Sequence, residues 1–219
     1  MTFSLAPHVH AAVIGGDVVL LDVDGDEYYC VRDGVLALGL AADLRALEPR
    51  DGTVGEALVE DGLAVLGPSS GPTRRPLEAP DLEAPDQDLP ARAAEPVSAR
   101  DLAALCGALW DFAAHYRGQS FADILAYVDG DRANLAPAET LRLASVFARA
   151  APWLPIPRQC LIRSFVLLRF LQRSGADAQW VLGVRTWPFA AHCWLQLGRI
   201  VLDDSADRLA VYQPILVVP

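Results

Sequence analysis

The chain has 219 residues, of which 53% are hydrophobic, and a formal net charge of −10 at pH 7. This length and apolar content suffice for one ordinary domain or two small ones with buried cores. The acidic balance argues against a nucleic-acid partner, which would need a basic patch to displace counterions from phosphates. No apolar run approaches the roughly 18 residues that span a bilayer, and the N-terminus lacks the basic and apolar blocks of a signal peptide. We therefore expect a globular cytoplasmic protein that binds neither nucleic acid nor membrane.

The cysteines are widely spread and form no C-x-x-C pair. They are Cys30, Cys106, Cys160 and Cys193. This spacing indicates neither a disulfide framework nor a zinc ribbon, and it agrees with a reducing compartment.

The first third of the chain alternates short β-rich runs with glycine-containing turns. Residues 9–14, 18–23 and 27–31 form three such runs, which predicts a three-stranded antiparallel meander. Apolar residues then recur at helical spacing in 35–47 and 53–60, so helices are expected there.

This order of elements resembles the small winged-helix domain of PqqD-like proteins, which recognises leader peptides of ribosomally made natural products. The resemblance covers residues 1–67 and implies that a leader docks as an extra strand on the third strand, an edge with unpaired backbone groups. It implies leader contacts from Tyr28, Tyr29 and Leu58; the alternative is that these residues fill a small core. DNA binding is not expected, because residues 53–60 carry no basic side chain.

Residues 68–97 are rich in proline, among Ser, Gly, Asp and Glu. Such a run cannot form a helix or the interior of a sheet. We expect an extended, partly disordered linker, which either raises the effective concentration of a ligand shared by two modules or is an inert spacer.

The remaining residues, 98–219, open with helices. Ser98 and Asp101 are spaced as a helix start, and apolar positions predict helices up to Gly118, over 121–128 and over 137–150. We read these helices as scaffold.

Cys160 follows an extended proline-rich approach and opens an apolar helix that Gly175 ends. Unpaired N–H groups and the partial positive charge of a helix N-terminus stabilise a thiolate, which lowers a thiol pKa from its usual value of about 8.5. Cys160 is therefore a candidate nucleophile. The alternative is a small buried Cys at the start of a core helix.

Strands are expected over 178–184, 192–197 and 200–203. In the second strand, His192 shares a face with Trp194 and Gln196, and Cys193 lies on the opposite, core-facing side. A zinc site from Cys160, His192 and Cys193 is therefore not expected.

Two carboxylates compete to orient His192. The strand register that pairs Leu195 with Ile200 places Asp203 opposite His192, and an alternative register places Asp204 there. Facing alone favours Asp203.

Several motifs in this half resemble the lasso-peptide B proteins, leader peptidases of the transglutaminase-like superfamily. They are Cys160-Leu161-x-Arg163-Ser164, Leu182-Gly183-Val184, Pro188-Phe189-x-x-His192-x-Trp194, Asp204 and Tyr212-x-Pro214-Ile215-Leu216. The resemblance implies an α+β chain with a transglutaminase-like or papain-like cysteine protease domain over 98–219. It makes Cys160 the nucleophile, His192 the base and Asp204 the orienting acid, with Asp203 as the second choice.

These assignments predict a cysteine endopeptidase that cuts the leader from a lasso-peptide precursor. The Cys160 backbone N–H and the Gln159 side chain are the expected oxyanion donors. The expected partners are the precursor peptide and an ATP-dependent macrolactam synthetase, and proteolysis requires no metal or cofactor. The alternatives are a transglutaminase-like acyltransferase and a non-catalytic leader-binding scaffold.

Overall fold

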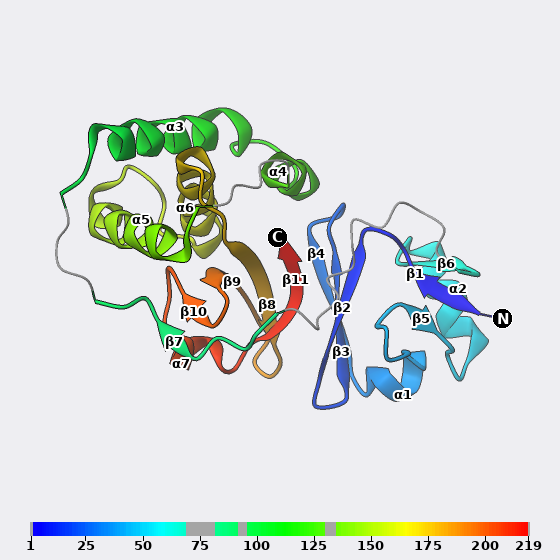
Figure 1. Ribbon diagram of the computed structural model, residues 1–219. Helices are drawn as coiled ribbons and strands as arrows, with labels where there is room; N and C mark the ends of the chain where they lie inside the picture. The colour runs from blue at the N-terminus through cyan, green and yellow to red at the C-terminus, as the bar shows by residue number, and fades with distance from the viewer. Residues whose placement is uncertain (1, 69–81, 92–95, 130–134, 219) are drawn as a thin grey trace. The chain divides into compact units, whose positions relative to one another are not determined.

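The computed structural model describes residues 2–68, 82–91, 96–129 and 135–218, and Figure 1 shows its mixed α and β composition. The chain divides into two compact units. Unit 1 comprises Met1–Glu78, Gly183–Ala191 and Gln213–Leu216, and unit 2 comprises Ala79–Leu182, His192–Tyr212 and Val217–Pro219. Two segments from the C-terminal half, Gly183–Ala191 and Gln213–Leu216, thus belong to the unit that contains the N-terminus. The sequence had predicted two domains that are each continuous in sequence. Independent folding of residues 1–67 and 98–219 stays a prediction.

The first sheet of unit 1 is the expected meander. Strands β2 (Val9–Ile14), β3 (Asp17–Asp22) and β4 (Glu27–Val31) pair antiparallel in the order β2-β3-β4. The turn between the first two strands uses Gly15 and Gly16 at positive φ, where a side chain would be strained. In this arrangement β4 is an edge strand of its sheet.

A second sheet in unit 1 was not foreseen from the sequence. Strand β1 (Phe3–Leu5) lies between β5 (Ala46–Leu47) and β6 (Ala64–Leu66), and both pairings are antiparallel. These strands are two or three residues long, too short for their alternation to stand out in the sequence.

The N-terminal part of unit 1 also contains two helices, α1 (Gly34–Leu38) and α2 (Gly52–Glu60). The helix expected over 35–47 is wrong beyond Leu38. There Gly39 takes φ 55°, and a Cβ at this position would overlap the carbonyl oxygen of Glu48. The chain therefore turns and returns as β5, because the tertiary approach of Glu48 overrides the helical spacing.

The core of unit 1 joins residues from both sheets and both helices. Its buried members include Phe3, Leu5, Val9, Leu20, Leu38, Leu47 and Leu58. Residues far apart in sequence thus share one apolar interior.

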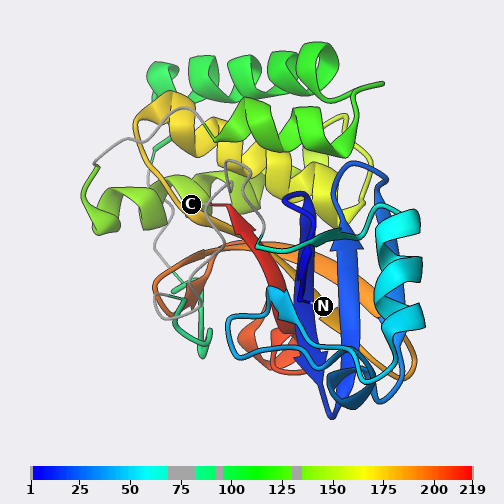
Figure 2. The ribbon, with the colours of Figure 1, turned by 90° about the vertical axis from the view of Figure 1, so that its right-hand side faces the viewer.

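Unit 2 contains the helices that the sequence predicts. They are α3 (Ala99–His115), α4 (Phe121–Val128), α5 (Pro137–Ala150) and α6 (Cys160–Ser174), followed later by the short α7 (Ala206–Leu209). The expected start of α3 is a capping box between Ser98 and Asp101, and Gly175 at φ 85° ends α6. Figure 2 shows α3 and α6 side by side.

The sheet that carries the candidate site has five strands. Its order is β11 (Gln213–Val218), β8 (Gln179–Arg185), β9 (Ala190–Leu197), β10 (Ile200–Val201) and β7 (Gln87–Asp88). Strand β10 pairs antiparallel with β9 and parallel with β7. This sheet places a segment near residue 87 beside Ile200–Val201, far from it in sequence, and the C-terminal strand β11 at the opposite edge.

Strand β7 lies within the expected linker, of which residues 69–81 and 92–95 are outside the described residues. The described part is extended, as expected, but it is not a free tether. Asp86 forms an ion pair with Arg199, and Asp88 Oδ1 accepts a 2.7 Å hydrogen bond from the backbone N–H of Ala206. A proline-flanked segment is compatible with this position because an edge strand needs only one side of its backbone for pairing.

A buried ion cluster holds α6 against α3. The Asp111 side chain on α3 is 1% exposed and accepts hydrogen bonds from Arg169 at 2.9 Å and Arg173 at 2.6 Å, both on α6. Tyr127 donates a third bond to it at 2.9 Å. Burial acts to raise the pKa of Asp111, but the bonds from Arg173 and Arg169 outweigh it and hold the pKa at about 2. Because α6 begins at Cys160, this cluster also fixes the helix that carries the candidate nucleophile.

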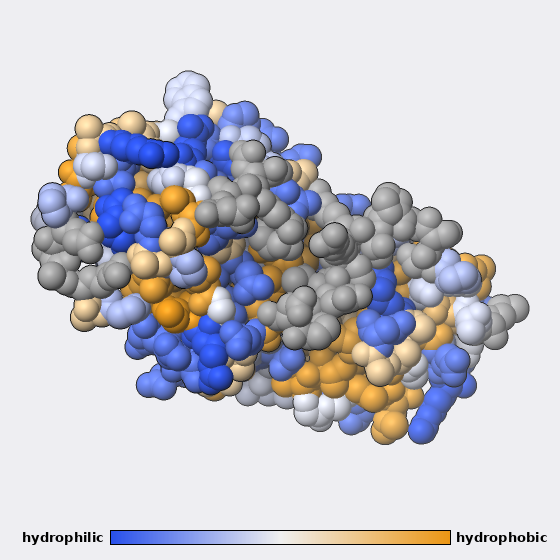
Figure 3. All heavy atoms as spheres, viewed as in Figure 1, coloured by the Kyte–Doolittle hydropathy of each residue, from blue (hydrophilic) through white to orange (hydrophobic). Residues whose placement is uncertain are grey.

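Within the described ranges, no helix is long and apolar enough to cross a membrane. Figure 3 shows hydrophilic side chains over much of the visible face, with hydrophobic side chains gathered in patches between them.

Candidate active site

Cys160 is the first residue of α6, as the sequence predicts. The residue before it, Gln159, is the N-cap in an extended conformation, and its carbonyl accepts the hydrogen bond of Arg163 N at 3.0 Å. Cys160 is half-buried, while Gln159 is exposed and makes no side-chain capping bond. The sulfur therefore lies at a helix N-terminus that is reachable from solvent.

His192 lies on β9 and connects Cys160 to Asp204. Its Nε2 is 2.6 Å from Asp204 Oδ2, and the imidazole also hydrogen-bonds with the Cys160 side chain. Since Nε2 faces the carboxylate, Nδ1 is the ring nitrogen left to exchange a proton with sulfur. His192 is 8% exposed. The three side chains thus form a continuous Cys–His–Asp chain of hydrogen bonds.

Asp204 is itself held in place. Its Oδ1 accepts a 2.9 Å hydrogen bond from Ser205 N, and Arg208 Nη1 lies 3.5 Å from its Oδ2. Both contacts fix the orientation of the carboxylate, whose oxygen can accept a hydrogen bond from the imidazole N–H.

These contacts move the pKa values of Cys160 and His192 apart. Hydrogen bonds from Cys193 and then His192 lower the pKa of the Cys160 thiol to about 4, against the opposing effect of burial. The hydrogen bond with Cys160, followed by that with Asp204, raises the pKa of His192, again against burial. Both shifts favour a thiolate beside an imidazolium, the reactive form of a cysteine nucleophile.

Asp203, the second candidate for the orienting acid, points elsewhere. Ile200 pairs with Leu197 and Val201 with Gln196, so neither of the two registers considered from the sequence forms, and the one that favoured Asp203 is wrong. Its Oδ1 accepts a 2.9 Å hydrogen bond from the backbone N–H of Leu195. Removal from solvent raises the pKa of Asp203 to about 7. It therefore supports β9, whereas Asp204 contacts the imidazole.

Cys193 and Ser164 were missed as parts of the site. Cys193 is buried, as expected, but its thiol and backbone N–H both hydrogen-bond with Cys160. Ser164 Oγ lies 3.4 Å from Cys193 Sγ. Alternation along the strand places Cys193 and His192 on opposite faces, so the sequence did not indicate that both lie near Cys160. For Ser164, the available signal was its spacing of one helical turn after Cys160.

The residues expected to bind a leader do not share one surface. Leu58 is 8% exposed and lies in the core of unit 1, against which Tyr29 also packs. Tyr28 is on the opposite face of β4, with its ring centroid 5.6 Å from that of Phe189, also in unit 1. Leu58 therefore lies in the core, which was the alternative to a leader contact in the sequence analysis.

Among the residues that the structure describes, no group of three or more His, Cys, Asp or Glu side chains is arranged to hold a metal ion. Cys160, His192 and Asp204 can together supply a nucleophile and a proton donor: attack on a carbonyl, proton transfer to a leaving group, and release of the acyl group.

Comparison with known proteins identifies the class. Residues 106–217 match the transglutaminase-like superfamily, and the chain belongs to this superfamily. Over 55 residues the chain is 42% identical to the microcin J25-processing protein McjB of Escherichia coli; the aligned region is 24% of this chain and 26% of McjB. The match thus spans about a quarter of that relative. No solved structure shows a significant match.

Proposed function

We propose that this protein is the leader peptidase of a lasso-peptide pathway, a cysteine endopeptidase that cuts the leader from the core of a precursor peptide. The observation that carries this proposal is the hydrogen-bond chain from Cys160 through His192 to Asp204 at the start of α6. The processing role in the name of McjB, together with the motifs around Cys160 and His192, adds support.

In the proposed reaction, the Cys160 thiolate attacks the scissile carbonyl carbon and forms a tetrahedral intermediate. The carbon–nitrogen bond then breaks as the His192 imidazolium gives its proton to the departing amine, so the core peptide leaves with a new α-amine. Asp204 holds the imidazole in the orientation that this transfer needs. A water molecule, deprotonated by His192, attacks the thioester and releases the leader as a free carboxylate with Cys160 as thiolate.

Oxyanion stabilisation is proposed for the backbone N–H of Cys160, one of the unpaired donors of the first turn of α6. The Gln159 side chain is proposed to donate a second hydrogen bond to the oxyanion, because it is exposed at the N-cap and directly precedes Cys160. Its role stays a prediction.

Recognition of the leader is proposed for residues 1–67. The edge strand β4 offers backbone N–H and C=O groups to an extended peptide. Tyr28 and Tyr29 on β4 are both half-buried. Tyr29 packs against the core of unit 1, so Tyr28 is the residue proposed to contact the leader, whereas Leu58 supports the strand from the core. The other proposed partner is an ATP-dependent macrolactam synthetase that closes the ring onto the freed amine. A thiolate nucleophile stays reduced in the cytoplasm, the proposed compartment.

The test is incubation of the full-length protein with a candidate precursor peptide, sought among small open reading frames near its gene, followed by mass spectrometry. The expected products are a leader with a free carboxylate and a core with a free amine, whose masses add up to precursor plus one water. Cys160→Ala is expected to abolish cleavage, while the matched control Cys106→Ala, at an exposed site on α3, keeps it. Cleavage that survives in Cys160→Ala excludes the proposed nucleophile.

The same reaction mixture separates the alternatives. An acyltransferase yields a leader joined to an added amine, and a scaffold yields no product while still binding the peptide. Leader binding by Cys160→Ala, measured by titration, shows that loss of cleavage is chemical. Absence of binding at high micromolar concentration contradicts the recognition role of the N-terminal residues.

A further inference from the structure

Part of the proline-rich segment that the sequence predicted as a linker is bound to the strands of unit 2. Strand β7 pairs in parallel with β10, and Asp88 lies opposite Val201 in this pairing. The backbone N–H groups of Asp86 and Gln87 both donate to the carbonyl oxygen of Arg199, at 3.1 and 3.2 Å. These bonds fix the backbone at the point where the Asp88 side chain leaves it.

A buried amide on β9 holds the same segment a few residues earlier. Gln196 is 0% exposed, and its Nε2 donates hydrogen bonds to the carbonyl oxygens of Glu83 at 3.0 Å and Gly198 at 2.9 Å. Its Oε1 accepts a 2.9 Å hydrogen bond from Trp194 Nε1. Because a buried amide N–H without an acceptor is costly, the Glu83 carbonyl has a fixed place in unit 2.

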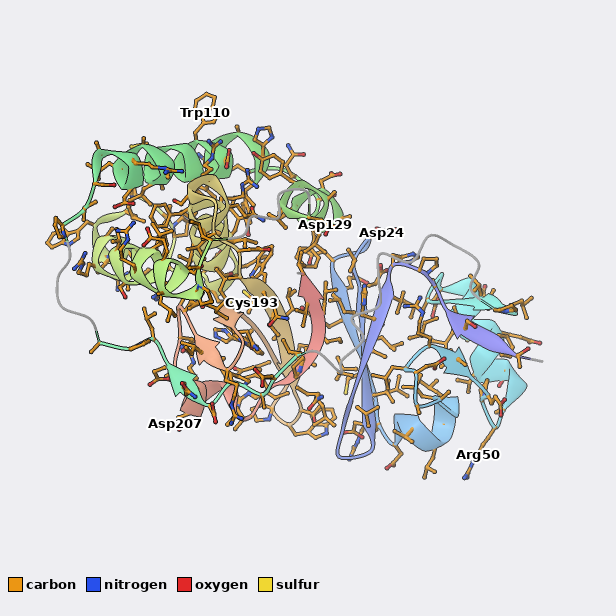
Figure 4. The ribbon with its side chains drawn as sticks, viewed as in Figure 1. Asp24, Arg50, Trp110, Asp129, Cys193 and Asp207 are labelled. Atoms are coloured by element: carbon orange, nitrogen blue, oxygen red, sulfur yellow. The ribbon has the colours of Figure 1, made fainter. Side chains whose placement is uncertain are left out.

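The Asp88 side chain reaches from this fixed strand to the turn that carries Asp204. Asp88 Oδ1 accepts a 2.7 Å hydrogen bond from the backbone N–H of Ala206, the first residue of α7. Ala206 is 9% exposed, and Ser205 at the N-cap makes no side-chain bond to the helix. Asp88 therefore supplies an acceptor for an N–H group that the helix itself cannot satisfy. Figure 4 shows β7 beside α7, on which Asp207 is labelled.

The same turn holds both oxygens of the Asp204 carboxylate. Ser205 N donates to Oδ1 at 2.9 Å, and Arg208 Nη1 on α7 lies 3.5 Å from Oδ2. Oδ2 is also the atom that lies 2.6 Å from His192 Nε2. Hydrogen bonds weaken steeply when their geometry is disturbed, so a displaced turn weakens the contact between Asp204 and His192.

We propose that Asp88 is a positioning residue of the peptidase, which holds the turn between β10 and α7 and so keeps the Asp204 carboxylate directed at His192. This inference rests on the proposed roles of Asp204 and His192. Asp88 touches no substrate atom and transfers no proton. The catalytic unit accordingly includes a segment of the chain that the sequence analysis assigned to the linker.

The first test compares cleavage of the precursor by Asp88 variants of the full chain. Asp88→Ala loses one hydrogen bond and is expected to lower kcat by about twofold to tenfold with KM unchanged. Asp88→Asn keeps an acceptor oxygen and is expected to retain the wild-type kcat. The matched control is Asp86→Ala, which removes only an exposed ion pair with Arg199 from the same segment and is expected to leave kcat unchanged.

The second readout is proton NMR of the full chain without peptide. It follows the downfield resonance of the imidazole N–H that is hydrogen-bonded to Asp204, which is assigned by its loss in His192→Ala. Asp88→Ala is expected to move this resonance upfield and to speed its exchange with water. Asp88→Asn and Asp86→Ala are expected to leave it in place.

A further variant, Asp88→Val, removes the acceptor while favouring the strand, and melting curves verify that each variant is folded. In folded Asp88→Ala and Asp88→Val, a wild-type value of either kcat or the resonance overturns the inference. So does a loss in Asp88→Asn or Asp86→Ala as large as that in Asp88→Ala. The NMR measurement needs no precursor, so a protein whose resonance responds as expected but which cleaves nothing overturns the proposed function alone.

Discussion

The contact between His192 and Asp204 makes a quantitative prediction for the pair of variants Asp204→Asn and Asp203→Asn. Asp204 Oδ2 lies 2.6 Å from Nε2, and the two side chains are 14% and 7% exposed, so solvent screens the contact little. A hydrogen bond between charged groups at such a site contributes about 1.5–3 kcal/mol. At 1.36 kcal/mol for each factor of ten in rate, Asp204→Asn should lower kcat by about tenfold to 150-fold.

Asp203→Asn is the matched control, because it makes the same chemical change one residue away. The amide oxygen of Asn can still accept the 2.9 Å hydrogen bond from Leu195 N. The pKa of Asp203 is raised to about 7, so this carboxyl is already partly neutral near neutral pH. We expect kcat to fall by less than about threefold.

The pH profile of kcat supplies an independent readout. The wild-type enzyme needs a Cys160 thiolate, whose pKa is lowered to about 4, and a His192 imidazolium, whose pKa is raised. The profile should therefore be a plateau that falls on the acid side as the thiolate takes up its proton and on the alkaline side as the imidazolium loses its proton. Asp204→Asn removes one of the bonds that raise the pKa of His192, so the alkaline limb should move to lower pH.

Steady-state cleavage of the precursor across the pH range measures both effects, with melting curves to verify folding. Two results refute the reasoning: an Asp203→Asn variant that loses as much activity as Asp204→Asn, or an alkaline limb that stays in place when Asp204 is replaced.

Three stability predictions follow from close contacts within the fold, each measured as the free energy of unfolding in urea. Ser164→Ala leaves the buried Trp180 Nε1 without its 2.8 Å acceptor and should cost about 1–3 kcal/mol; no change in midpoint contradicts this. Asp111→Ala leaves Arg169 and Arg173 without their carboxylate partner and should lower the free energy of unfolding by about 3–5 kcal/mol. Because the pKa of Asp111 is about 2 when folded and about 3.9 when unfolded, its contribution is present above the unfolded value and is lost as pH falls through the folded one. The variant should therefore show a weaker loss of stability in acid. Gly39→Ala, at φ 55° against Glu48, should cost at least about 2 kcal/mol, whereas Gly52→Ala, with open space around it, should be neutral.

The helices of unit 2 were predictable because their signals are local. The capping box at Ser98, the proline that opens α5 and the glycine that ends α6 each act within one turn. The same holds for Cys160, whose place at a helix start follows from the prolines before it. The meander of unit 1 was predictable from alternation and from its glycine turns.

Contacts between residues distant in sequence decided the rest. The helix expected over 35–47 stops at Leu38 because Glu48 packs against Gly39, and strand β7 forms because β10 offers it a free edge. Neither contact has a local signature.

The sequence by itself determined the candidate nucleophile and base, and its resemblance to a family selected Asp204. The tertiary structure decided which carboxylate touches the imidazole: Asp204 contacts His192, whereas Asp203 accepts a hydrogen bond from Leu195 N. It also brought Cys193 to the sulfur of Cys160, which alternation along a strand had not predicted. Side-chain direction along one strand is a local property, but contact across a helix–sheet junction depends on how both elements pack.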